Sequence, residues 1–171
     1  MTRAFVSILC AAVLGAAAYP VPLYSAGSAT LSLSPAAGSY PMGAVFAVYV
    51  VLDTKGNAVY GVDIAYLNYN SSVLAVQDED VSVAGVQILA GSLMPDTVAN
   101  SVDVVRGRIL FSQVAAPNSL FTGQGTLATI RFKAITTGNA AVTFDFAPNI
   151  TADTNVAAGG EDILSAVENG Q

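Results

Sequence analysis

The chain has 171 residues, 53% of them hydrophobic and 11% charged, which is the length of one domain with ample apolar material for a core. The formal net charge of −6 and the lack of any basic run exclude nucleic acid and anionic lipid surfaces as natural partners. Histidine is absent and the single cysteine is Cys10, which excludes histidine-dependent catalysis, histidine-ligated metals, cysteine zinc sites and an intrachain disulfide.

The first 26 residues are typical of a secretory signal peptide, because Arg3 is followed by an apolar stretch over residues 4–18 and then by small residues. That stretch is shorter than the roughly 20 residues that span a bilayer as a helix. Cleavage at residue 18 and cleavage at residue 29 both satisfy the small-residue rule. We expect a secreted, extracellular protein that meets a membrane only through this leader, if it stays uncleaved as an anchor or pilin-like helix.

From residue 29 onward, short β-rich runs are separated by turn residues, and no amphipathic helix stands out. Residues 31–34 alternate with period two, and residues 35–43 form a loop with two prolines and two glycines. Residues 44–52 are apolar on both faces, which indicates a central strand or one whose outer face meets something else. The remaining expected strands are residues 59–69, 73–76, 83–89, 108–112, 126–134, 142–146 and 164–167.

Strands at this spacing predict an all-β fold over residues 29–171: an antiparallel two-sheet β-sandwich of the jelly-roll type with about nine strands. The clearest strand is residues 126–134, where Ile130 and Phe132 point inward and Arg131 and Lys133 outward. Residues 91–100 are expected to be irregular. No internal repeat and no linker divides the domain.

Three segments carry a resemblance to a known family. The first runs from Val-Tyr-Gly-Val-Asp at 59–63 into Leu-Asn-Tyr-Asn-Ser-Ser-Val-Leu at 67–74, and the second from 85–88 through Gly-Arg-Ile-Leu-Phe at 107–111. The third is Phe-Thr-Gly-Gln-Gly-Thr-Leu-Ala-Thr-Ile-Arg-Phe at 121–132. Together they resemble a cohesin domain, whose Gly-x-Gly-x-Leu-Ala-x-Ile-x-Phe stretch is similar to the third. The resemblance spans about residues 29–146.

Two departures from the family pattern stand out. Asn70 and Ser71 replace the usual Asp-Pro, and the spacing from Asp63 to Tyr69 is one residue longer than in the family. Asp63 is therefore not carried over as a dockerin-facing residue. The resemblance implies a non-catalytic extracellular scaffold module that binds a dockerin-type protein or takes part in a polysaccharide-associated assembly at the cell surface.

The expected partner-binding residues are Val62, Ile64 and Tyr66, which alternate along one face of a strand opposite Leu67 and Tyr69. Pointing outward, they would form an apolar patch suited to a protein partner. The alternative is that the strand is central and both of its faces are covered. No enzyme is expected, because only scattered carboxylates remain as catalytic material.

No cofactor is expected, apart from a possible structural calcium ion in one of two acidic loops. The candidate ligands are Asp78 and Asp80 in one loop, and Asp153 and Asn155 in the other. Neither loop has the EF-hand spacing, and solvated loop residues are the alternative at both places.

Two further functions remain open at this stage. A carbohydrate-binding module is suggested by the kinship of cohesins to cellulose-binding sandwiches, although the chain has no tryptophan to stack on sugars. A structural subunit of a surface layer or filament would retain the leader as its anchor.

Overall fold

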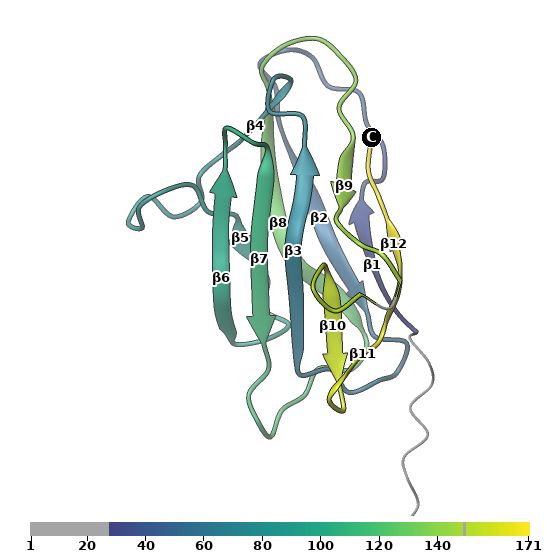
Figure 1. The fold of residues 1–171 in the computed structure, drawn as a ribbon. Coiled ribbons are helices and arrows are strands. Elements are labelled where there is room, and N and C mark those ends of the chain that lie inside the picture. The colour runs from purple at the N-terminus through teal and green to yellow at the C-terminus, as the bar shows by residue number, and fades with distance from the viewer. Residues whose placement is uncertain (1–27, 149) are drawn as a thin grey trace, which may run out of the picture.

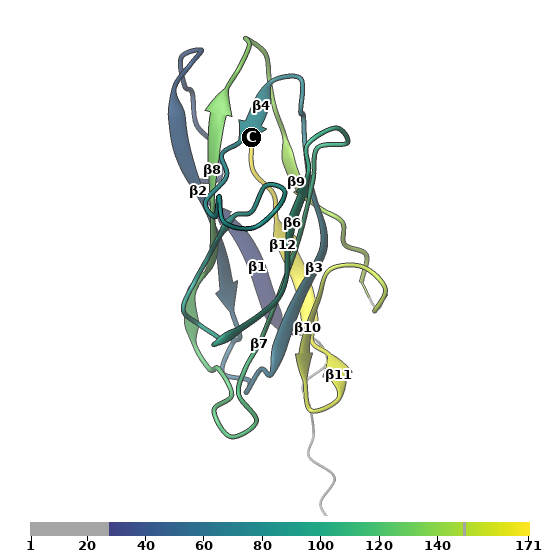
Figure 2. The same ribbon diagram turned by 90° about the vertical axis from the view of Figure 1, so that its left-hand side faces the viewer.

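The protein is a sandwich of two β-sheets packed face to face (Figures 1 and 2), in a computed structural model that describes residues 28–148 and 150–171. The sheet we call the β2 sheet has the order β12-β1-β2-β8-β4, with β5 also paired to β8. The β3 sheet has the order β11-β10-β3-β7-β6, with β9 also paired to β3. The strands are β1 (Ala29–Ser34), β2 (Val45–Asp53), β3 (Gly61–Tyr69), β4 (Leu74–Val76), β5 (Leu89–Ala90), β6 (Asp96–Asp103), β7 (Arg108–Val114), β8 (Gln124–Ala134), β9 (Val142–Phe144), β10 (Asn155–Ala158), β11 (Glu161–Asp162) and β12 (Leu164–Glu168).

The all-β two-sheet sandwich predicted from the sequence is confirmed. Twelve strands are present in the described residues rather than about nine, because several, such as β5 and β11, are only two residues long. Most pairings are antiparallel, but β12 runs parallel to β1. The described residues contain no helix long and apolar enough to cross a membrane. The leader and its cleavage site lie outside the described residues.

The core lies between the sheets and is filled by inward residues that alternate along each strand. Along β8, Leu127, Ala128, Ile130 and Phe132 are fully buried, so the strict alternation of residues 128–134 reports the packing face. The Phe132 ring centroid lies 5.4 Å from that of Tyr69 in the opposite sheet. Such cross-sheet contacts join the two layers into one core.

A β-bulge in β3 sets which residues reach this core. Ile64 pairs with Phe111 and Leu67 with Ile109, so two residues of β3, Ala65 and Tyr66, face a single residue of β7. The inward phase therefore shifts by one position, and Ile64 and Leu67 both point into the core. The bulge lies between Asp63 and Tyr69, the stretch that was expected to be one residue longer than the cohesin pattern.

Two expected elements differ from the structure. Residues 83–89 form a loop rather than a strand, with only Leu89 at its end pairing to β8. Residues 96–103, expected to be largely irregular, form the strand β6. β6 lies at the edge of the β3 sheet and carries polar side chains on much of its length, so it lacks the apolar alternation that marks a buried strand.

The two ends of the described chain lie at opposite ends of the sandwich (Figures 1 and 2). β1 and β12 are neighbours and run in the same direction, with Ala29 aligned to Leu164 and Ser32 to Glu168. Residue 28 therefore precedes β1 at one end, while Gln171 follows β12 at the other.

Candidate functional site

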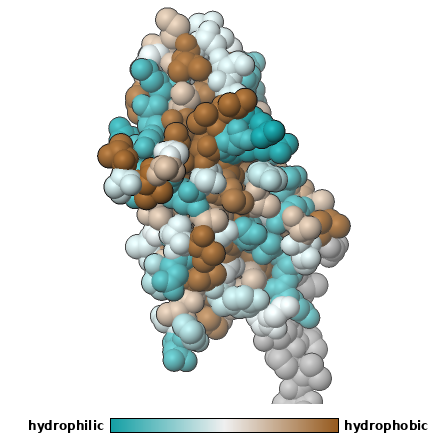
Figure 3. Space-filling view, turned by 60° about the vertical axis from the view of Figure 1, so that its left-hand side comes forward, coloured by the Kyte–Doolittle hydropathy of each residue, from teal (hydrophilic) through white to brown (hydrophobic). Residues whose placement is uncertain are grey.

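The outer surface of the β3 sheet is not covered by any other element of the described residues (Figures 1 and 2). The β3 face, as we call it, carries the outward side chains of three adjacent strands. They are Asp63, Tyr66, Asn68, Ala99, Ser101, Asp103, Arg108, Leu110 and Ser112. Seen from the β6 side (Figure 3), the apolar surface is broken into patches by polar residues.

Tyr66 and Arg108 form the centre of the upper half of this face. The Arg108 guanidinium carbon lies 4.8 Å from the centroid of the Tyr66 ring, in a cation–π contact. The bulge turns Tyr66 outward, while β7 alternation turns Arg108 to the same side. Within the described residues Arg108 makes no ion pair, so its charge remains available to a partner.

The turn between β6 and β7 lies next to Tyr66 and Arg108 and lines the same depression as these two side chains. The Val105 and Arg106 N–H groups donate to Asp103 Oδ1 over 3.1 and 2.9 Å, and the Arg106 guanidinium donates to Oδ2 over 2.8 Å. These hydrogen bonds, with that from the Arg106 backbone N–H the largest, lower the pKa of Asp103 below its ordinary value of 3.8.

These groups enclose a shallow depression of about 320 Å³, lined by Tyr66, Ser101, Asp103, Arg106, Arg108 and Leu110. The depression thus has a tyrosine and two arginines around a half-buried leucine. Tyrosine and arginine are the residue types that contribute strongly at protein interfaces. Lower on the same face, the Ser112 hydroxyl donates to Asp63 Oδ1, so this carboxylate is partly occupied within the sheet.

Of the three residues expected to bind a partner, only Tyr66 is exposed. Its side chain is 41% accessible, whereas Val62 and Ile64 are 2% and 1% accessible and belong to the core. The expectation that all three share one outward face is wrong. The cause is the bulge, which lets Ile64 and Tyr66 point to opposite sides although they lie two positions apart.

Asp78 and Asp80 hold a loop together rather than facing each other across a common centre. Asp78 Oδ1 accepts hydrogen bonds from the N–H groups of Asp80 and Gln87, both over 3.1 Å. Asp80 Oδ1 accepts the Ser82 hydroxyl over 2.5 Å and the Ser82 N–H over 3.1 Å. The Ser82 groups, the hydroxyl first, lower the pKa of Asp80. Both carboxylates thus serve as acceptors for loop donors.

The second acidic loop also uses its polar groups locally. Asp153 Oδ2 accepts the Ala147 N–H over 2.5 Å, and the Asn155 amide nitrogen donates to the Asp153 carbonyl oxygen over 3.2 Å. Asp153 Oδ1 has no donor within the described residues. In residues 28–148 and 150–171, no three acidic, cysteine or histidine side chains lie in an arrangement that could hold a metal ion. A structural calcium ion and solvated loop residues both stay predictions for these two loops.

Fold and face together define a class of protein: a small all-β sandwich module with one open, mixed polar and aromatic sheet face. Comparison with solved structures shows that this module has the fold of cohesin domains. The solution structure of the cohesin CaCohA2 from Clostridium acetobutylicum aligns with a TM-score of 0.62 and 23% identity, covering 85% of this chain and 89% of that one.

Two structures from Acetivibrio cellulolyticus are similar as well. The third cohesin ScaC, in complex with the ScaB dockerin, gives a TM-score of 0.62 at 18% identity over 84% of this chain and 96% of that one. A type II cohesin domain from the cellulosome gives 0.59 at 17% identity over 85% and 94%. No protein-family model and no curated protein sequence matches the chain. The chain thus has the cohesin fold, as its sequence motifs indicated.

Sequence reasoning missed Arg108, Ser101 and Asp103 as parts of the face. The alternation of residues 108–112 places Arg108 beside Leu110 and Ser112 on one side of a strand, so this signal was present. Ser101 and Asp103 lie on β6, for which no strand was expected. Their position depends on pairing with β7, which the sequence does not display.

Proposed function

We propose that this protein is a non-catalytic, extracellular scaffold module that binds a dockerin-type protein through the β3 face. The observation that carries the proposal is the exposed Tyr66 ring held under the Arg108 guanidinium on an uncovered sheet. Support comes also from the fold, since similar cohesins, such as the third cohesin ScaC, form complexes with dockerins.

The physical case rests on how this face would gain free energy in a complex. Tyrosine and arginine are enriched at the residues that dominate protein interfaces, because both bury large apolar area and keep hydrogen-bonding groups. The cation–π contact fixes both side chains before binding, which reduces the entropy lost in the complex. The open sheet face offers a partner protein a contact surface that extends over three adjacent strands.

The test is direct binding of the purified domain to a panel of type I and type II dockerins, measured by isothermal titration calorimetry. We expect at least one dockerin to bind, and Tyr66→Ala and Arg108→Ala each to weaken that complex by about tenfold or more.

Tyr49→Ala is the matched control. Tyr49 is 43% accessible, against 41% for Tyr66, but lies on β2 in the other sheet. It should leave affinity unchanged. Failure of every dockerin to bind, or equal losses from the Tyr49 and Tyr66 substitutions, would count against this interface.

The extracellular part of the proposal rests on the leader. N-terminal sequencing of the exported protein should give a mature chain that begins at residue 19 or residue 30. Retention of Met1 in the exported protein would instead favour an anchored form.

A further inference from the structure

A second hollow lies between the sheets at the end of the sandwich where β1 and β8 end. Its volume is about 540 Å³, within the range of small-molecule sites. Buried residues of both sheets form its apolar floor: Leu33, Val48, Leu74, Ala134 and Val142. It is separate from the β3 face, because none of its lining residues belongs to that face.

Backbone hydrogen bonds hold the walls of this pocket in place. The Gln171 N–H donates to the Ala36 carbonyl over 2.8 Å, and the Gly38 N–H donates to the Gln171 carbonyl over 3.1 Å. Gly170 exchanges two hydrogen bonds of 2.9 Å with Val142. The last residues of the chain thus join the loop after β1 to β9, which gives the pocket a fixed shape before any ligand arrives.

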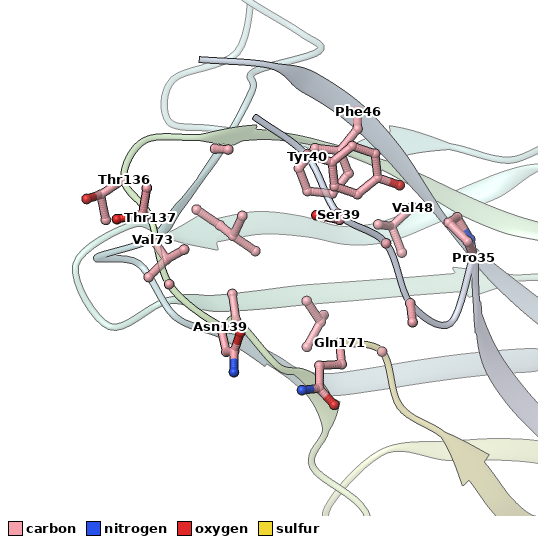
Figure 4. Close-up of a pocket in the computed structure, with 18 of the residues that line it drawn as sticks. Pro35, Ser39, Tyr40, Phe46, Val48, Val73, Thr136, Thr137, Asn139 and Gln171 are labelled. Carbon is pink, nitrogen blue, oxygen red and sulfur yellow. The ribbon is translucent and has the colours of Figure 1, made fainter. Parts of the chain in front are cut away.

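The chemistry of the lining is uniform in one respect: no charged side chain is among the lining residues. Uncharged hydrogen-bonding side chains line the pocket, namely Ser39, Thr136, Thr137, Asn139 and Gln171. The amides of Asn139 and Gln171 lie on one side (Figure 4), and the rings of Tyr40 and Phe46 on the other. Those rings are stacked with centroids 3.7 Å apart and an interplanar angle of 3°.

These observations restrict the ligand. No side chain of the lining would give an ionic ligand a counter-charge in return for the hydration that it loses. An extended peptide is best bound along an unpaired strand edge, whereas the walls here are strand ends and loops whose backbone groups already pair. A neutral ligand with many hydroxyl groups and apolar C–H faces fits both halves of the lining, because amides and hydroxyls donate as well as accept.

We propose that this pocket binds a neutral sugar ring, its hydroxyls facing Asn139, Gln171 and the threonines, and its C–H face over the apolar floor beside Tyr40. The proposal goes beyond dockerin binding and concerns a different surface. It gives a location to the carbohydrate-binding alternative, which the sequence alone could not place.

The experiment is a two-dimensional amide NMR titration of the full domain. The neutral probes are the methyl glycosides of glucose, galactose, mannose and N-acetylglucosamine, together with cellobiose and maltose, at millimolar concentration. Glucuronic acid is the charged counterpart of glucose. At least one neutral probe should cause saturable shifts at the amides of Ser39, Thr137 and Asn139, and glucuronic acid should cause none there.

The paired substitution Asn139→Ala with Gln171→Ala removes the amides while leaving the backbone hydrogen bonds, and should weaken binding by about tenfold or more. Tyr66→Ala, on the β3 face, should leave it unchanged. The proposal is overturned if no neutral probe shifts these amides saturably, or if glucuronic acid binds equally well. An uncharged Gly-Ser-Pro peptide serves as a further probe. The proposal is also overturned if this peptide is the only probe that binds there. Dockerin affinity, measured separately, is unaffected by any of these outcomes.

Discussion

Gly107 closes the turn between β6 and β7 at a position where no side chain fits. Its φ is +65°, and a Cβ there would lie 2.2 Å from the Tyr69 carbonyl oxygen. Gly107→Ala should therefore lower the free energy of unfolding for two reasons. Holding alanine at a positive φ costs about 1–2 kcal/mol, and the clash with the Tyr69 carbonyl oxygen adds the cost of displacing β3. Gly56→Ala is the control, since Gly56 has a φ of +87° but open space around it. Urea unfolding should show the Gly107 variant to be clearly the less stable; equal losses would contradict the clash.

The stability that Asp103 contributes to the β6–β7 turn depends on pH. Because its pKa in the folded protein is below 3.8, the hydrogen bonds to Arg106 contribute stability fully above pH 3.8, and this is lost as the pH falls through the folded-state pKa. Arg106→Ala should raise the pKa only part of the way back, because the Arg106 backbone N–H, which remains, is the largest cause. An NMR titration of the Asp103 carboxyl measures this. A full return to 3.8 would make the guanidinium the main cause instead.

At the scale of a strand, the bulge of β3 predicts which deletion the fold tolerates. Removing Ala65 leaves one residue opposite Leu110 and keeps Ile64 and Leu67 inward, so it should cost no more than about 1–2 kcal/mol. Removing Asn68 should instead turn the buried Tyr69 outward and unfold the domain, because a one-residue slip exchanges the two faces. Circular dichroism and urea unfolding of both variants make the comparison. Equal tolerance of the two deletions would show that the register of β3 is not fixed by this bulge.

The same strand shows how far the sequence predicts the structure. The alternation along β8 was visible because one face is buried and the other carries Arg131 and Lys133. The bulge of β3 was not visible, since two residues facing one can be counted only when the partner strand is known. β6 was missed for a related reason: as an edge strand it has little apolar periodicity of its own. The pairing of β3 with β7 sets the register of β3 and determines which of its side chains point outward. For this reason only Tyr66, among the expected site residues of this strand, is exposed.

At the scale of the whole molecule, stability should not depend on calcium. Asp78 and Asp80 each use Oδ1 to accept hydrogen bonds within their own loop, and the described residues contain no group of three or more acidic side chains that could hold a metal ion. The melting temperature should be the same in EDTA and in calcium. A rise above about 2–4 °C, equivalent to about 1 kcal/mol in a domain of this size, would contradict this and place an ion in an acidic loop. Asp78→Asn and Asp153→Asn would then identify which loop binds it.

The pocket at the end of the sandwich is a property of the whole chain. Its lining comes from the loop after β1, the loop after β8 and the last two residues, which are far apart in sequence. No local sequence motif predicts this pocket, because each of these segments alone has the composition of an ordinary polar loop. The fold brings them together by pairing Gly170 with Val142 and Gln171 with Ala36.

The parallel pairing of β1 with β12 has a mechanical consequence. The described chain begins at one end of the sandwich and ends at the other, with these two strands side by side between them. A pulling force applied at residue 28 and Gln171 would act along the strands, so that their hydrogen bonds bear the load in shear and together rather than opening one after another. Each terminal strand is also paired or packed within the sandwich, β1 to β2 on its other edge. Separating β1 from β12 along the strand direction would therefore require breaking their hydrogen bonds together.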